Sequence, residues 1–166
     1  MAEFKRPILK IPLSYLEILE IVSLSGIITI FLYLFIAWEQ IPEKVPTHFG
    51  SSGLPDSWGG RGSLLFLAFL IIPLYSLLTI ISKFPHIFNY LCEITEANAR
   101  FQYQNTRTMI VLLKTELIFI FGYIEWKSIQ VAVGKASGLG TAFLPVLLLV
   151  VFGTIGIYIY RTIKYK

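Results

Sequence analysis

The chain has 166 residues, of which 55% are hydrophobic and only 14% charged, and its mean hydropathy is +0.71. A soluble domain of this length needs about a quarter of its residues charged, so the composition excludes a soluble protein and indicates an integral membrane protein. The net charge of +4 does not indicate nucleic-acid binding, because the basic residues stand at the ends of apolar runs, where they meet lipid headgroups. The single cysteine, Cys92, excludes an intramolecular disulfide and a cysteine-cluster metal site, and no motif indicates a cofactor.

Four apolar runs are long enough to cross the hydrocarbon layer of a bilayer, which is roughly 30 Å thick. The first opens with Glu17 and Glu20, which suit the positive end of a helix dipole. The second follows Ser63, a predicted N-cap, and we expect a kink at Pro73 in its middle. The sequence therefore predicts an all-α four-transmembrane-helix bundle, a single membrane domain over 1–166, with spans at about residues 18–38, 64–81, 109–126 and 141–160.

The third helix is predicted to be longer than the membrane is thick. Thr95, followed by Glu96, is typical of a helix start, and nothing stops that helix before Trp126. Its length of about 31 residues corresponds to about 46 Å. We therefore expect its first three turns to project from the membrane, as part of a cytoplasmic segment at residues 82–108.

The distribution of basic residues predicts the orientation, because cytoplasmic segments carry an excess of lysine and arginine. With the N-terminus inside, nine basic residues lie near the cytoplasmic ends of the spans and four near the opposite ends. Both termini are then cytoplasmic, in the cell membrane, and the loop at residues 39–62 is outside. The nine are Lys5, Arg6, Lys10, Lys83, Arg100, Arg107, Arg161, Lys164 and Lys166, and the four are Lys44, Arg61, Lys127 and Lys135.

The outer loop at residues 39–62 has the composition of a structured loop rather than of a linker. Its prolines and Gly53 favour a fixed series of turns, with Asp56 bonded to backbone amides and Trp58 at the headgroup level. The alternative is a metal or acid–base site formed by His48, Asp56 and Glu125, although their spacing is not a metal signature. The loop motif is Pro42, Pro46, His48, Phe49, Gly53, Pro55, Asp56 and Trp58.

Ionisable residues inside the predicted spans are costly and need partners or water. Lys114 and Glu116 are two residues apart in the third span, so they point to different sides of the helix and cannot pair with each other. Glu20 lies at the depth that Lys114 can reach, and we predict a contact between these two side chains. The competing interpretation, which the sequence favours, is that Lys114 extends along the helix to the inner interface.

A basic stripe runs along the third helix, because Arg100, Arg107 and Lys114 repeat every seven residues. We interpret it as a solvated face. The alternative is a site for anionic lipid headgroups or for a cytoplasmic partner.

Two stretches carry a family resemblance. The first is the outer-loop motif. The second comprises Asn89 and Tyr90, followed by Thr95, Asn98, Gln102 and Tyr103. Together they resemble a domain-of-unknown-function family of small prokaryotic membrane proteins, a domain that also forms the N-terminal part of SdpI-type toxin-immunity proteins. The resemblance implies a membrane domain and, as an expectation only, a role in immunity.

Three functional hypotheses follow from these features. The leading one is a non-enzymatic membrane protein in the lipid bilayer that binds a peptide or a membrane protein with its outer loop and a cytoplasmic partner with its third helix. The second is an extracytoplasmic metal-binding or metal-dependent site that uses His48 and Asp56. The third is a small proton-coupled transporter that uses Glu20 or Glu116. A homo-oligomer is compatible with all three.

Overall fold

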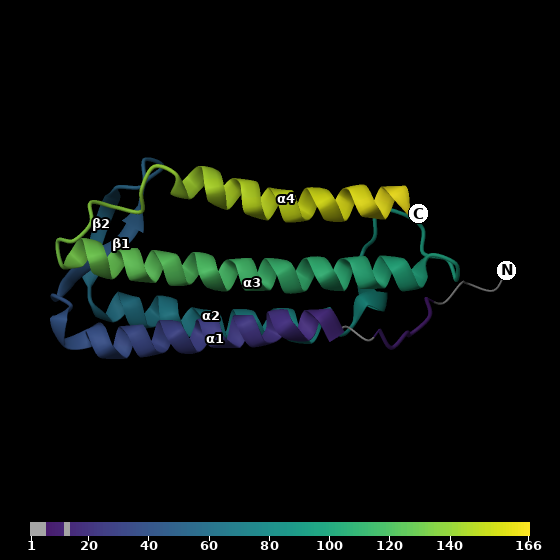
Figure 1. The fold of residues 1–166 in the computed structure, drawn as a ribbon, viewed down its shortest axis with the longest axis horizontal. Coiled ribbons are helices and arrows are strands. Elements are labelled where there is room, and N and C mark those ends of the chain that lie inside the picture. Colours follow the sequence, from purple (N-terminus) through teal and green to yellow (C-terminus); the bar gives the residue numbers. More distant parts are fainter. Residues whose placement is uncertain (1–5, 12–13) are drawn as a thin grey trace.

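The computed structural model describes residues 6–11 and 14–166, so that Lys5, counted above among the basic residues, lies outside them. Four long helices dominate it (Figure 1). A two-stranded antiparallel hairpin and two short 3-10 helices connect them. In chain order the elements are α1 (Ser14–Ala37), η1 (Trp38–Gln40), β1 (Lys44–Phe49), β2 (Pro55–Gly60), α2 (Gly62–Ser82), η2 (Pro85–Ile87), α3 (Ala99–Ala132) and α4 (Phe143–Lys164).

Helix α3 is the centre of the molecule. Figure 1 shows α1 and α2 along one side of it and α4 along the other. The hairpin closes one end of the bundle, which we call the hairpin end. The last turn of α4 lies at the opposite end, which we call the terminal end (Figure 1).

Three helices among the described residues are long and apolar enough to cross a membrane: α1 with η1 (Leu16–Gln40), α2 and α4. Helix α3 does not meet this criterion, because it carries most of the buried polar side chains among the described residues. Polar groups on a central helix find hydrogen-bond partners on its neighbours, whereas a helix that faces lipid must be apolar. The buried polar residues of α3 are Gln102, Asn105, Thr106, Lys114, Thr115, Glu125 and Ser128.

Two clusters of buried apolar side chains hold the helices together. The cluster at the hairpin end joins α1, α2 and α3 to the hairpin, since it contains the completely buried Val45 of β1 together with Ile30, Leu64 and Ile118. The cluster at the terminal end packs Leu16 against Tyr103 and other residues of α3. Burial of Val45 therefore fastens the hairpin to the bundle through the hydrophobic effect.

The predicted helix boundaries need correction. Helix α2 begins at Gly62, and the Ser63 hydroxyl donates to the Gly60 carbonyl oxygen at 2.9 Å, so Ser63 is not the N-cap. Helix α3 begins at Ala99 rather than at Thr95 and continues six residues beyond Trp126, to Ala132. Thr95 and the Asn98 side chain bond each other's backbone amides in the turn that leads into the helix, an arrangement similar to a capping box.

Residues 39–62, predicted as a series of turns, contain two paired strands instead. Lys44 pairs with Gly60 and Phe49 with Pro55, with irregularities around His48. Pro46 and Pro55 argue against a strand in a large sheet because proline lacks an amide donor. In a sheet of two strands each strand has a free edge, and the prolines are tolerated there.

Candidate functional site

The hairpin exposes a polar pair and two apolar side chains at one end of the molecule. Nδ1 of His48 lies 2.6 Å from Oδ1 of Asp56, and both side chains are more than half exposed. Trp58 and Leu54 are exposed by 44% and 53%. Asp56 therefore bonds the imidazole, not backbone amides as predicted. An exposed pair of this kind adds little stability.

The hairpin tip is fixed to the loop between α3 and α4. The Leu139 amide donates to the Gly53 carbonyl oxygen at 2.8 Å, and the Leu139 carbonyl oxygen accepts a 2.7 Å hydrogen bond from the Tyr123 hydroxyl. Gly53 has a φ of +77°, which favours glycine. A Cβ on Gly138 would lie 2.2 Å from the Gly53 oxygen, so the two backbones touch only because residue 138 is glycine. The hairpin is thus held in place at its tip as well as at its base.

The three metal candidates are not gathered by the fold. His48 and Asp56 meet on the hairpin, whereas Glu125 is buried in α3. No group of three or more histidine, cysteine, aspartate or glutamate side chains able to hold a metal occurs in the part of the chain that the structure describes. The metal hypothesis therefore rests on His48 and Asp56 alone.

A buried polar network joins α1, α2 and α3 inside the bundle. The Lys114 ammonium group donates to Glu20 Oε1 at 2.5 Å and to the Thr79 hydroxyl at 2.9 Å, and it lies 4.5 Å from the centroid of the Tyr75 ring. The Tyr75 hydroxyl donates to Glu20 Oε2 at 2.9 Å. Lys114 is only 1% exposed. The predicted Glu20–Lys114 contact is confirmed, and all three helices contribute to it.

This burial corrects two interpretations of the sequence. Lys114 does not extend to an interface, because Glu20 and Thr79 satisfy its ammonium group where it stands. The basic stripe is not a solvated face either. Its Arg107 donates to the Ile11 carbonyl oxygen at 2.7 Å, and of the three residues only Arg100 is exposed. Tyr75 and Thr79 were not among the candidates, although two polar residues four apart in an apolar span are a signal that could have found them.

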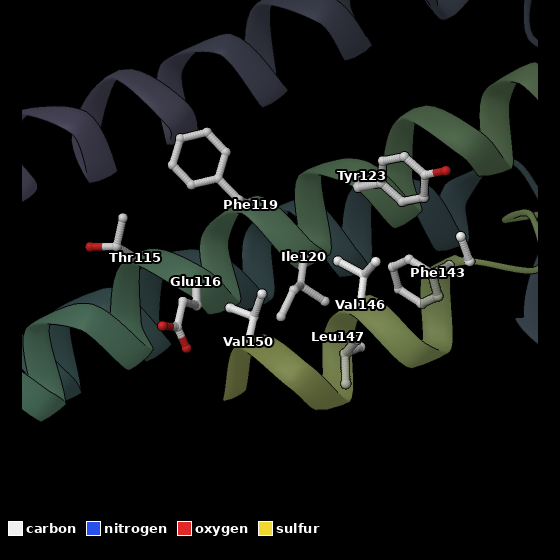
Figure 2. A pocket seen from close by; sticks show the side chains of 10 residues that line it. Thr115, Glu116, Phe119, Ile120, Tyr123, Phe143, Val146, Leu147 and Val150 are labelled. Carbon is white, nitrogen blue, oxygen red and sulfur yellow. The ribbon is translucent and has the colours of Figure 1, made fainter. Parts of the chain in front are cut away.

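Glu116 faces α4 rather than the network. The Thr154 hydroxyl donates to Glu116 Oε1 at 2.5 Å, and Oε2 has no hydrogen-bond partner among the described residues. Beside this contact lies a groove of about 460 Å³ between α3 and α4. Figure 2 shows Ile120 of α3 directed toward Val146 and Val150 of α4, which make the groove walls apolar.

The second predicted motif organises the terminal end. The Tyr90 hydroxyl donates to the Pro85 carbonyl oxygen, and its ring lies 5.8 Å from that of Tyr103. Burial raises the pKa of the Tyr90 hydroxyl. The Gln102 amide donates to the carbonyl oxygens of Thr162 and Tyr165. Of the remaining members, Asn98 and Thr95 form the turn before α3, and Asn89 is exposed beside η2.

Comparison with known proteins assigns no activity. The sequence profile of a domain of unknown function (DUF1648) matches residues 26–72, which include part of α1, the whole hairpin and part of α2. A protein of Archaeoglobus fulgidus described as uncharacterized is 39% identical over 75 residues, which cover 40% of this chain and 41% of that relative. The chain thus spans about two fifths of the length of the curated relative it matches. No solved structure matches.

Proposed function

We propose that the protein is a non-enzymatic integral membrane protein that binds a peptide, or the exposed part of another membrane protein, with its hairpin. In this proposal all four long helices cross the bilayer, both termini are cytoplasmic, and the hairpin lies outside. Helix α3 crosses because its buried lysine is neutralised by Glu20 and because α1, α2 and α4 flank it. The excess of basic residues at the terminal end supports this orientation.

The observation that carries the proposal is a rigid hairpin with exposed binding chemistry. The hairpin is fastened by Val45 at its base and by Gly53 at its tip, so little conformational entropy is lost when a partner binds. Trp58, Leu54 and the His48–Asp56 pair offer aromatic, apolar and polar contacts on the same element. The resemblance to SdpI-type immunity proteins adds one specific class of partner, a membrane-active peptide toxin.

The test compares bacterial cells that express the protein with cells that carry an empty vector, under challenge with a panel of membrane-active peptides. We expect expression to raise the inhibitory concentration of at least one peptide. Trp58→Ala and Asp56→Asn should abolish the protection at unchanged protein level. Ser52→Ala, on the same exposed tip, should keep it. Equal sensitivity of all strains to every peptide would contradict the immunity role.

Proton-coupled transport is a second candidate, and the buried Glu20–Tyr75–Lys114 network is the observation that favours it. A carboxylate held between helices can exchange a proton when the helices move. Purified protein in vesicles that contain a pH-sensitive dye tests this candidate. A proton flux that Glu20→Gln or Glu116→Gln abolishes would support transport, and a flux equal to that of empty vesicles would reject it.

A further inference from the structure

Glu125 is the least satisfied side chain in the part of the chain that the structure describes. It is 1% exposed, and neither carboxyl oxygen has a hydrogen-bond partner among the described residues. Those residues form two salt bridges, His48–Asp56 and Glu20–Lys114, and Glu125 takes part in neither. Burying a charged group without a partner is strongly unfavourable in general. Such a group either stays uncharged or takes a cation from outside the chain as its partner.

The other ionisable side chains inside the bundle show how this chain normally treats such groups. Lys114 has two hydrogen-bond acceptors and an aromatic ring, and Glu116 accepts a hydrogen bond from Thr154. Glu125 stands two to three turns along the same helix and has neither kind of partner. Other buried side chains of α3 leave single polar atoms without a partner, but among the described residues only Glu125 leaves two.

Glu125 lines a groove of about 630 Å³ between α1 and α3, which we call the α1–α3 groove. The groove has aromatic walls, formed by Tyr33 of α1 and by Phe119, Tyr123 and Trp126 of α3. Figure 2 shows Phe119 extending away from α4, on the side of α3 that faces this groove.

The aromatic walls are suited to a cation. The Lys127 ammonium group already lies 5.0 Å from the centroid of the Trp126 ring and 5.9 Å from that of Tyr123, and it forms no salt bridge with Glu125. Aromatic faces attract ammonium groups, and the attraction grows when the cation is desolvated. A carboxylate and several aromatic rings around one apolar groove are the chemistry that recognises an organic cation.

We propose that the α1–α3 groove binds an organic cation with an apolar body, whose ammonium group lies against the Glu125 carboxylate. A bare metal ion fits less well, because divalent cations need several oxygen or nitrogen ligands and no such cluster occurs among the described residues. A plain lipid chain would fill the apolar walls but would leave the carboxylate unpaired. This site is separate from the hairpin surface.

The test uses octyltrimethylammonium as the cationic probe and octanol as its uncharged counterpart of equal chain length. The full-length protein, purified in an uncharged detergent, carries Trp38→Phe and Trp58→Phe, so that Trp126 in the groove is the only tryptophan. We expect the cationic probe to change the Trp126 emission saturably and octanol to produce no saturable change.

Two glutamate variants distinguish binding of the probe at Glu125 from the effect of removing any carboxylate from α3. Glu125→Gln keeps the shape and removes the charge, and it should weaken probe binding by at least about tenfold, the value of one charge-assisted contact. Glu116→Gln changes the other carboxylate of α3, which accepts a hydrogen bond from Thr154 and does not line this groove. It should leave binding within about twofold of the parent protein.

Glu125→Asp keeps the charge and should retain tighter binding than Glu125→Gln. Equal binding of the probe by the parent protein and Glu125→Gln would overturn the proposal. Saturable changes of the same size with octanol would overturn it too, because they would show apolar partition only. Absence of any saturable change with the cationic probe would also reject the site.

Discussion

Lys114 and Glu20 are unequal partners, and this inequality determines what their removal does. The Lys114 side chain is completely enclosed, whereas the Glu20 side chain is 28% exposed and can turn toward water or lipid headgroups. Breaking a buried pair is costly because the remaining charge stays buried without compensation. The cost of each substitution therefore depends on which charge is left behind.

We predict that Glu20→Gln destabilises the protein more than Lys114→Met does. Glu20→Gln leaves the buried ammonium group with weaker acceptors and should cost about 3 kcal/mol. Lys114→Met leaves a carboxylate that is partly exposed and still accepts from Tyr75, so it should cost less. Thermal unfolding of the purified variants in detergent measures both. If Lys114→Met were the more destabilising change, the network would not depend on burial of the ammonium group.

At the scale of elements, the contact between the hairpin tip and the α3–α4 loop depends on Gly138. We predict that Gly138→Ala separates the two, because its Cβ would lie 2.2 Å from the Gly53 oxygen. Overpacking of this kind costs about 1–3 kcal/mol. Hydrogen exchange of the Leu139 amide, which donates to Gly53, reports the separation directly.

The matched control for this substitution is Gly60→Ala in β2, where an added Cβ meets no atom within 4 Å. Its exchange rates should equal those of the parent protein. Unchanged protection of the Leu139 amide in Gly138→Ala would show that the hairpin tip and the loop can move together to make room.

Polar contacts help to attach helix α4 to α3, and Thr162, the one buried residue of α4, takes part in them. The Asn105 amide donates to the Tyr158 carbonyl oxygen and to the Thr162 hydroxyl, and Gln102 donates to two carbonyl oxygens at the end of α4. We predict that Gln102→Ala combined with Asn105→Ala speeds hydrogen exchange in the last turns of α4 by about tenfold or more, since each lost hydrogen bond costs about 1 kcal/mol.

Gln104→Ala is the control for α4, because Gln104 is partly exposed and its side chain makes none of these contacts. Exchange in α4 should be unchanged in that variant. If the double variant also left α4 protected, apolar packing alone would hold the helix.

At the scale of the whole molecule, the proposed orientation places the hairpin outside and the turn before α3 in the cytoplasm. In a Cys92→Ser background we predict that Ser51→Cys reacts with a membrane-impermeant maleimide on intact cells. Ala97→Cys should react only after the cells are opened. Both positions are exposed on the surface of the protein, so a difference in labelling reports the side of the membrane. The reverse pattern would invert the proposed topology and remove the hairpin from extracellular partners.

The sequence by itself determined the features that depend on local patterns. Apolar runs of sufficient length and few charges predicted the helices α1, α2 and α4 within a few residues, because a helix that faces lipid must be apolar over its whole length. Depth along the helices predicted the contact of Glu20 with Lys114, since 1.5 Å per residue is a fixed geometry.

Only the tertiary structure showed that α3 lies between the other helices, and with it the contacts between segments that are far apart in the sequence. Burial of Lys114, the isolation of Glu125 and the contact of Gly53 with Gly138 all arise between segments far apart in the chain. The sequence did not predict the pairing of β1 with β2, because both strands contain proline. Proline is tolerated at the edge of a sheet, and both strands of a two-stranded sheet are edge strands. Hydropathy measures how apolar a segment is, and it cannot tell a polar helix surrounded by apolar ones from a helix outside the membrane.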